Sequence, residues 1–364
     1  MLDPFLSFNT PTHPVDSRPV YPTRRLLVAD PIHPDDYTLE IDYSTLSRYI
    51  KCPRDFFNYS IRTREANKSQ SATDFGHLVH KCEETRLMHG DTGLDTSISA
   101  LDGRTVREHQ SHLITEHFRA HPVSPSDHRT DARLRSILTQ YNSLYAHDGW
   151  PQSILIHNDH KFVEKAFKIP VTTIAVNTTL NYPHADLVAA STSDATSFPV
   201  RNIHIVYTGR IDACIRNSNL LWVVDHKTSS RGGSEFLSAF TTSLQTRGYV
   251  WAAQKLTGLK FAGLILNALV IKPPTAKLFN NTELDRPTYF YSADSISEFE
   301  ENLHHHCLSL VSSLIASAFP QSALSFKSPC SGCDYIDNCS LPRTQRPLDL
   351  QSAYYRNVTW NPTN

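Results

Sequence analysis

The chain has 364 residues, of which 40% are hydrophobic and 20% are charged, and its formal net charge is −1. This is the composition of a globular protein with enough residues for one large domain or two smaller ones. The near-neutral charge excludes a protein-wide positive field for nucleic acid, so phosphate binding must come from a local patch or from metal.

The N-terminal region shows no targeting or membrane signal. The chain has no run of 18 apolar residues, and residues 1–20 lack a basic segment followed by an apolar one. We therefore expect an intracellular, cytoplasmic protein with no membrane partner, located in the host cytoplasm if the chain is viral. Residues 1–38 carry seven prolines and no sustained periodicity, which predicts an N-terminal arm that is disordered or wrapped on the body.

A short helix is expected at residues 43–53. Ser44 is a candidate N-cap, and apolar residues follow it at helical spacing. Pro53 ends the helix, so that Cys52 lies at its last turn.

A second helix is expected at residues 75–88, where apolar residues form a stripe. Gly76 and His80 are four residues apart and share one face of this helix. The glycine would let a strand or a substrate backbone come close where the imidazole points. A lone helical histidine is more often packed or solvated than a ligand, and the chain has 19 histidines.

The next two segments change from helical to strand character. Residues 91–150 are mostly helical and polar in pattern, which predicts an insertion that could cover or thread a substrate. Strand character starts near Lys161 and includes Glu164. Glu164 is a candidate outer-shell carboxylate near a metal, although exposed strand glutamates are common.

The central feature of the sequence is a predicted hairpin at residues 209–228, with a polar turn at residues 216–219. Asp225 and Lys227 are two residues apart, so both project from one face of a strand, and Asp212 can reach the same point from the adjacent strand. Two carboxylates and a lysine then share one pocket, which suits Mg²⁺ with positions left for water and a phosphate. The lysine can orient or help deprotonate the attacking water, or offset charge on phosphorus.

The alternative for this hairpin is a solvated surface pair of Asp225 and Lys227, because charged residues are usually exposed. The context argues against it. Residues 220–224 form a continuous apolar run, so Asp225 ends a strand that is buried on both faces. Carboxylates are rare there without a partner or a function.

A helix at residues 234–258 is expected after the hairpin. Gln245 and Tyr249 are four residues apart on one face, where an amide and a phenol could grip a phosphate, a sugar or a base edge. Residues 227–277 predict a local basic patch, because they hold a single acid, Glu235. The seven basic residues of this patch are Lys227, Arg231, Arg247, Lys255, Lys260, Lys272 and Lys277.

Beyond this helix, an apolar strand is expected at residues 261–271 and a long helix at residues 295–318. The helix carries three consecutive histidines at residues 304–306, which we interpret as solvated surface rather than a metal site. Residues 341–364 are expected to form a polar C-terminal tail.

Three cysteines, Cys330, Cys333 and Cys339, are spaced as C-x2-C-x5-C. Without an export signal disulfides explain them poorly, and three thiolates need a fourth ligand to complete a four-cysteine metal or iron–sulfur site. Cys52 is the candidate. A zinc site built from the same four is the alternative, because ligand softness and number do not separate zinc from iron. The remaining cysteines lie in apolar patterns and are expected in the core: Cys82, Cys214 and Cys307.

Together these motifs resemble the RecB-like branch of the PD-(D/E)xK nuclease superfamily. They are most similar to its members with a C-terminal iron–sulfur cysteine cluster, namely AddB-type nuclease domains, CRISPR-associated spacer-acquisition nucleases, and exonucleases of phages and mitochondria. The resemblance covers residues 43–340 and rests on six elements in this order: Ser44-x2-Ser47-x4-Cys52-Pro53, Gly76-x3-His80, Gly209-x2-Asp212, Asp225-x-Lys227, Gln245-x3-Tyr249 and the cysteine triplet.

The resemblance implies an α/β fold with a restriction-endonuclease-like core, in which helices flank a central mixed sheet. A helical insertion and an iron–sulfur clip complete one nuclease domain over residues 39–340. Mg²⁺ or Mn²⁺ would be bound by His80, Asp212 and Asp225. Lys227 would serve the attacking water, and Gln245 with Tyr249 would contact DNA. A [4Fe–4S] cluster would be held by Cys52, Cys330, Cys333 and Cys339.

The function implied is that of a metal-dependent DNA nuclease, expected to be an exonuclease on DNA ends or single strands in recombination, repair or replication. The chain lacks a G-x4-G-K-[ST] P-loop, so unwinding would need a helicase or recombinase partner. Two alternatives remain. One is a non-cleaving DNA-binding or scaffold subunit of a helicase–nuclease complex, and the other is an RNA-processing nuclease with a structural zinc site.

Overall fold

The computed structural model describes residues 26–68, 71–182, 196–275, 278, 281–322 and 329–358. Residues 1–25 of the expected arm, Lys277 of the expected basic patch and residues 359–364 of the expected tail lie outside the described residues. Within the described ranges, no helix combines the length and the apolar character needed to cross a membrane.

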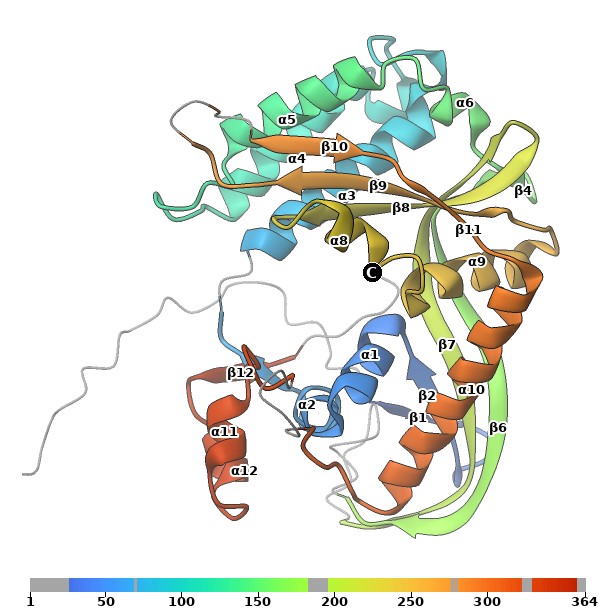
Figure 1. Cartoon of the computed structure of the whole chain (residues 1–364), viewed down its shortest axis with the longest axis vertical. Coiled ribbons are helices and arrows are strands. Elements are labelled where there is room, and N and C mark those ends of the chain that lie inside the picture. The colour runs from blue at the N-terminus through green and yellow to red at the C-terminus, as the bar shows by residue number, and fades with distance from the viewer. Residues whose placement is uncertain are drawn as a thin grey trace, which may run out of the picture.

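A mixed sheet of eight described strands forms the centre of the molecule. The β2–β7 and β8–β9 pairs are parallel, and the other pairs are antiparallel. In Figure 1, β6 and β7 form a long curved ribbon that joins the upper and lower parts of the molecule. The order along the sheet is β1 (Leu27–Ala29), β2 (Asp36–Ile41), β7 (Phe198–Asn217), β8 (Leu220–Ser229), β9 (Gly263–Ile271) and β10 (Thr282–Asp285), with β6 (Val163–Leu180) on β7 and β11 (Thr288–Phe290) on β9.

Helices cover both faces of this sheet (Figure 1). On one face, α3 (Ser71–His89) and α5 (Asp131–Leu144) pack against Leu269 of β9. On the other face, α9 (Leu244–Thr257) and α10 (Ala293–Ile315) pack against Leu266. The remaining described α-helices are α1 (Tyr43–Lys51), α2 (Pro53–Phe56), α4 (Val106–Ala120), α6 (Trp150–Ser153), α8 (Ser234–Ser238), α11 (Ile336–Ser340) and α12 (Arg346–Asp349).

The expected α/β class, with a central mixed sheet flanked by helices, is confirmed by this arrangement. The insertion expected at residues 91–150 is present and contains α4 and α5. The predicted central hairpin is β7–β8. Its turn residues Ser218 and Asn219 have φ of 50° and 64°, the left-handed pair that matches the twist of a two-residue hairpin loop.

Part of the expected N-terminal arm belongs to the sheet. β2 runs parallel to β7, with Asp36 opposite Asn202 and Ile41 opposite Tyr207, so a domain boundary at residue 38 falls inside a paired strand. The partner strand lies about 165 residues further along the chain, which no local pattern reveals. Asp36 is held there by Arg201, whose Nε and Nη2 each donate to the carboxylate at 2.9 Å.

Two helix boundaries differ from the sequence expectation. The N-cap of α1 is Asp42 rather than Ser44, because an Asp42 oxygen accepts from the backbone N–H of Thr45 at 2.7 Å. The helix expected at residues 234–258 is interrupted after α8, and Ser243 caps the new start of α9. The break is stabilised by Thr246, whose hydroxyl donates to the carbonyl of Phe240 at 3.0 Å.

Part of the expected polar tail is folded onto the body, and we call residues 341–358 the C-terminal clasp. Its strand β12 (Tyr355–Asn357) pairs antiparallel with β3 (Arg64–Ala66). The Arg64 guanidinium donates to the carbonyl of Leu350 at 2.6 Å and to Asn357 Oδ1 at 2.7 Å. Clasp residue Tyr355 also stacks on Tyr335, with 5.8 Å between the ring centroids. The clasp therefore closes over the segment that carries the cysteine triplet.

Arg64→Ala is expected to open the clasp, because one side chain supplies these bonds to it. Loss of about 1.4 kcal/mol in the closed state corresponds to about tenfold faster tryptic cleavage at Arg356, measured by mass spectrometry. The control is Arg119→Ala, which removes an exposed ion pair with Glu116. Equal cleavage rates in both variants would contradict a clasp held by Arg64.

Candidate metal and active site

Three carboxylates lie in a row across β6, β7 and β8. The β6–β7 pairing of Val163 with Ala213 and of Lys165 with Ile211 places Glu164 opposite Asp212. The β7–β8 pairing of Ala213 with Val224 places Asp225 on the other side of Asp212. Directly opposite residues of antiparallel strands project from the same face. The sheet itself therefore gathers the three acids.

Glu164 has an unusual backbone for a strand residue. Its φ is 48°, in the left-handed region that residues with a side chain rarely adopt. Such strain persists where the surrounding structure holds it, and it often occurs at functional sites. The twist aims the side chain at Arg210, whose Nε lies 2.9 Å from Glu164 Oε2.

His80 of α3 reaches the same row of acids. Its Nδ1 lies 3.5 Å from Asp212 Oδ2. The approach of α3 to β8 depends on Gly76, because a Cβ at this position would lie 2.7 Å from Thr228 Oγ1. The Gly76-x3-His80 spacing thus allows the helix to come close and places the imidazole at the carboxylates.

Four predicted site residues meet here with Glu164: His80, Asp212, Asp225 and Lys227. The group with the closest ligand atoms differs from the predicted ligand set, because Glu164 takes the place of Asp225. The candidate ligand atoms of His80, Glu164 and Asp212 all lie within 4.8 Å of one another. Asp225 stands beside them, with Oδ1 2.8 Å from Lys227 Nζ. Among the described residues, no group forms a hydrogen bond to Asp225 Oδ2, although this side chain is 1% exposed.

The electrostatics of the row favour a bound cation. Burial, together with the charge of Asp212, raises the pKa of Glu164 to about 7. Burial also raises the pKa of Asp225, against the opposing effect of Lys227. For Asp212, burial acts to raise the pKa, but His80 and then His226 outweigh it and hold the pKa below the usual range. Crowded carboxylates with raised pKa values are the oxygen donors that a hard divalent ion prefers.

Lys227 remains a cation in this setting. Burial acts to lower its pKa, but Asp225 and Asp212 outweigh that effect and the pKa is raised. A charged ammonium held by a buried carboxylate therefore points along the same face as the candidate ligands.

Gln245 and Tyr249 lie on α9, and Tyr249 is near Asp225 and Asp212 of the row of acids. Gln245 Nε2 donates to Tyr249 Oη at 3.2 Å. Burial raises the pKa of Tyr249, and the charges of Asp225 and Asp212 raise it further, which places the phenol near the carboxylates. Both side chains are predicted DNA contacts, and this position is compatible with that role.

Two contributions to the site were not singled out from the sequence. Arg210 pairs with Glu164, and the backbone N–H of His226 donates to Asp212 Oδ2 at 2.7 Å. The sequence did contain a signal that Arg210 belongs to the site, because Arg210 stands two residues before Asp212 and therefore projects from the same face of the strand. The sequence contained no signal for the His226 contact, because that contact depends on the register between β7 and β8.

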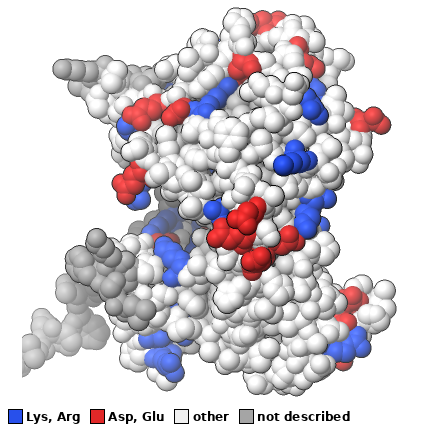
Figure 2. Space-filling view, turned by 45° about the vertical axis from the view of Figure 1, so that its right-hand side comes forward, with Lys and Arg blue, Asp and Glu red and all other residues white. Residues whose placement is uncertain are grey.

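The predicted basic patch is partly neutralised by acids from outside the counted segment. Arg247 pairs with Glu298 at 2.8 Å, Lys255 pairs with Glu300 at 2.9 Å, and Lys272 contacts Glu283. Figure 2, which brings the α10 side forward, shows acidic side chains gathered beside Lys and Arg near the middle of this face. The patch is therefore mixed in charge rather than uniformly positive.

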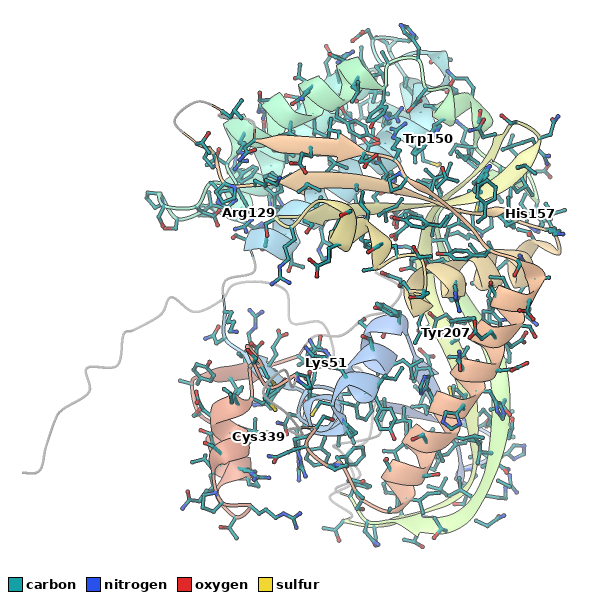
Figure 3. All side chains as sticks on the ribbon, viewed as in Figure 1. Lys51, Arg129, Trp150, His157, Tyr207 and Cys339 are labelled. Carbon is teal, nitrogen blue, oxygen red and sulfur yellow. The ribbon has the colours of Figure 1, made fainter. Side chains whose placement is uncertain are left out.

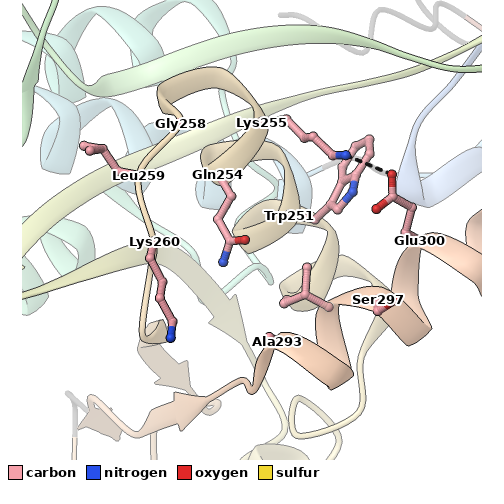
Figure 4. Close-up of a pocket in the computed structure, with 10 residues that line it drawn as sticks. Trp251, Gln254, Lys255, Gly258, Leu259, Lys260, Ala293, Ser297 and Glu300 are labelled. Carbon is pink, nitrogen blue, oxygen red and sulfur yellow. Dashed lines mark hydrogen bonds and ion pairs between the residues drawn. The ribbon is translucent and has the colours of Figure 1, made fainter.

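A separate pocket of about 440 Å³ lies between the end of α9 and the start of α10 (Figure 4). Its lining includes Trp251, Gln254 and Lys260, and none of the carboxylates of the row. Lys255 Nζ lies 5.5 Å from the Trp251 ring centroid and is paired with Glu300. The pocket belongs to the junction of two helices and not to the row of acids.

The four predicted cluster cysteines are brought into one region. Cys52 is buried at the end of α1, and the C-terminal triplet is half-buried around α11, where Figure 3 labels Cys339. Burial raises the pKa of Cys333, and the charges of Asp55, Cys339 and Cys52 raise it further. Cys333 and Cys339 pack against the same small cluster of buried residues. Cys330 is joined to this group by a turn, in which the Cys333 N–H donates to its carbonyl at 3.0 Å.

The cysteine region contains no disulfide among the described residues, since all seven thiols are free. Within the same described part of the chain, no three of the cluster sulfurs lie within 4.8 Å of one another. The three cysteines expected in the core are buried there, as predicted: Cys82, Cys214 and Cys307.

Comparisons with known proteins classify the chain. A family model described as "PD-(D/E)XK nuclease superfamily" matches residues 41–340. No curated protein matches the chain. The crystal structure of a "Putative exonuclease" from Eubacterium rectale is similar over 86% of this chain and 93% of that chain, with 10% identity and a TM-score of 0.43. The crystal structure of SSO0001 is similar over 83% and 86%, with 13% identity and a TM-score of 0.31.

Proposed function

Since the chain belongs to the PD-(D/E)XK nuclease superfamily, we propose that it is a metal-dependent deoxyribonuclease. We further propose that it is an exonuclease acting on DNA ends or single strands in recombination, repair or replication. The observation that carries the proposal is the convergence of Asp212, Asp225 and Lys227 with His80 and Glu164 at one point of the sheet. A helicase or recombinase partner would supply the ends or single strands.

The donor set fits Mg²⁺ or Mn²⁺. His80, Glu164 and Asp212 would hold the ion, and Asp225 would be a further ligand through its unpaired Oδ2. When bound, a divalent ion supplies Lewis-acid polarisation of the scissile phosphate and lowers the pKa of a bound water.

The remaining steps fall to side chains of the protein. Lys227 would stabilise the negative charge that develops on the phosphate during in-line attack, because its ammonium is held by Asp225 on the ligand face. Gln245 and Tyr249 would bind DNA beside the scissile phosphate, with an amide and a phenol as polar contacts. Arg210 would neutralise Glu164 when no cation is bound.

The experiment that tests this function compares linear and covalently closed circular DNA of the same sequence, with Mg²⁺ and with EDTA. An exonuclease degrades the linear form only, in a metal-dependent reaction. Equal loss of both forms would contradict exonuclease action. If the protein binds both forms and cuts neither, the non-cleaving DNA-binding subunit is supported instead, and preferential cleavage of RNA would support an RNA-processing enzyme.

We also propose that Cys52, Cys330, Cys333 and Cys339 hold a [4Fe–4S] cluster. The first observation behind this proposal is that Cys52 lies near the C-x2-C-x5-C triplet, and zinc held by the same four thiolates is the alternative. A second observation is a buried donor, Arg54 Nε, which has no acceptor among the described residues. Burial lowers the pKa of Arg54, and the charges of Cys339 and Cys52 act to raise it, which places the guanidinium near these sulfurs. An anionic cluster would be its partner.

Protein purified without oxygen is expected to be brown, with broad visible absorbance and about four iron atoms per chain. Cys333→Ser should lose most of this absorbance and iron, because it removes one ligand. Cys307→Ala is the matched control, since this thiol is buried in the core of α10. A colourless wild type that contains zinc would support the structural zinc site and end the cluster proposal.

A further inference from the structure

A chain of buried polar side chains leads from the candidate metal site into the helical insertion. It begins at His226 of β8, which is paired in register with Asn267 of β9. The two side chains meet, with Asn267 Nδ2 2.6 Å from His226 Nδ1, and the same Nδ2 lies 2.8 Å from Tyr141 Oη of α5. His226 and Asn267 are each 1% exposed.

Arg286 fixes the orientation of the Asn267 amide. Its Nε donates to Asn267 Oδ1 at 3.0 Å, and its Nη2 donates to Tyr141 Oη at 2.6 Å. Arginine is a donor only, so the oxygen of Asn267 must face Arg286 and the amide nitrogen must face His226.

The position of Arg286 is itself well determined. Its guanidinium carbon lies 3.4 Å from the ring centroid of Tyr145 and 3.7 Å from that of Trp150. Its Nη1 donates to Asp148 Oδ2 at 2.7 Å, and Asp148 also accepts from Arg86 of α3 at 2.6 Å. Figure 3 places Trp150 in the upper part of the molecule, where Figure 1 shows α5 above β8 and β9. The insertion thus holds Arg286 from several sides.

The orientation of the Asn267 amide bears on Asp212 through His226, which contacts both residues. Because the Asn267 amide donates, His226 Nδ1 is the acceptor and the ring is held from the side of the insertion. The backbone N–H of the same residue donates to Asp212 Oδ2 at 2.7 Å, the oxygen that also faces His80 Nδ1. His226 is therefore bonded at its ring to Asn267, which contacts Tyr141 of the insertion, and at its backbone to a candidate metal ligand.

We propose that Asn267 is a positioning residue of the candidate metal site, which, oriented by Arg286, ties the helical insertion to His226 and through it fixes the carboxylate of Asp212. This inference rests on the proposed function. The insertion then has a role in the chemistry besides any covering of the substrate. Partners of this kind orient the ligands that touch a metal, and their loss typically costs about 10- to 100-fold in metal affinity or activity.

The test compares Asn267→Ala, in β9, with a control that loses a similar buried bond within the insertion. Asn142 is suitable, because its Nδ2 donates to Gln110 Oε1 of α4 at 3.0 Å and its side chain is also buried. For the wild type and both variants, Mn²⁺ affinity is measured by EPR, cleavage of linear DNA by single-turnover kinetics, and folding by thermal unfolding.

Both variants are expected to unfold at lower temperature than the wild type. Asn267→Ala alone should bind Mn²⁺ about tenfold more weakly and cut DNA about 10- to 100-fold more slowly at saturating DNA, with KM for DNA close to that of the wild type. If Asn267→Ala does not fold, Asn267→Leu replaces it, because leucine keeps a similar volume and can neither donate to nor accept from His226. It should show the same losses.

Two contrary results are distinguishable. A wild type that binds Mn²⁺ and cuts DNA, with Asn267→Ala or Asn267→Leu equal to Asn142→Ala in Mn²⁺ affinity and rate, would overturn the positioning role and leave the proposed function intact. A wild type that neither binds Mn²⁺ nor cuts DNA would overturn the proposed function, and this inference with it.

Discussion

Asp212→Asn is expected to reduce DNA cleavage by about a thousandfold, or about 4 kcal/mol of transition-state stabilisation, without unfolding the protein. Asp212 stands in the middle of the row of acids, between Glu164 and Asp225. The amide keeps an oxygen for the N–H of His226, so the local backbone retains its partner. It removes the negative charge that a divalent ion would need most, since Asp212 is the acid of the row whose pKa is held low.

The measurement is the single-turnover rate on end-labelled linear DNA with Mg²⁺, beside Mn²⁺ affinity. The matched control is Asp36→Asn, which neutralises another buried carboxylate of the same sheet, bonded to Arg201 on β7. The control should cut DNA at close to the wild-type rate, although it is less stable. Wild-type cleavage by Asp212→Asn would remove this site from consideration.

Lys227→Met is expected to slow the chemical step by about 10²- to 10³-fold, the range for loss of one preorganised charge at a reacting phosphate. Methionine keeps much of the apolar stem of the side chain. Without the ammonium, the pKa of the buried Asp225 carboxyl should rise further, because Lys227 is the largest influence that lowers it. DNA binding should persist, since Gln245 and Tyr249 are untouched.

This prediction is checked by single-turnover rates together with DNA affinity. Lys168→Met provides the control, because Lys168 Nζ also pairs with a buried carboxylate of the sheet, Glu40 Oε1, at 2.7 Å. A Lys227→Met protein that cuts at the rate of Lys168→Met would show that the carboxylates act without the lysine. Loss of DNA binding in place of loss of rate would assign Lys227 to substrate binding.

The hairpin that carries the site was predictable because its signals are local. Strand β8 and its partner are defined within about 20 residues by three features: an apolar run that ends in Asp225, a lysine two residues after it, and a polar turn. The Gly76-x3-His80 spacing is likewise contained in one turn of α3. Short-range periodicity was sufficient in both cases.

The features that were not predicted depend on distant pairing. Glu164 was expected only as an outer carboxylate, and its place beside Asp212 follows from the β6–β7 register and a positive φ. Strand β2 and the C-terminal clasp pair with strands far away in sequence. Asn267 lies in a continuous apolar run and gave no signal, because its partners come from separate elements.

We propose that a divalent ion binds beside Asp212, and anomalous diffraction from crystals soaked in Mn²⁺ is the most direct test. We expect an anomalous peak at coordination distance from Asp212, with His80 and Glu164 or Asp225 completing the protein ligands. The peak should be absent in crystals of Asp212→Asn grown and soaked in the same way. A Mn²⁺ peak elsewhere in wild-type crystals, or an empty carboxylate row at saturating Mn²⁺, would contradict the account.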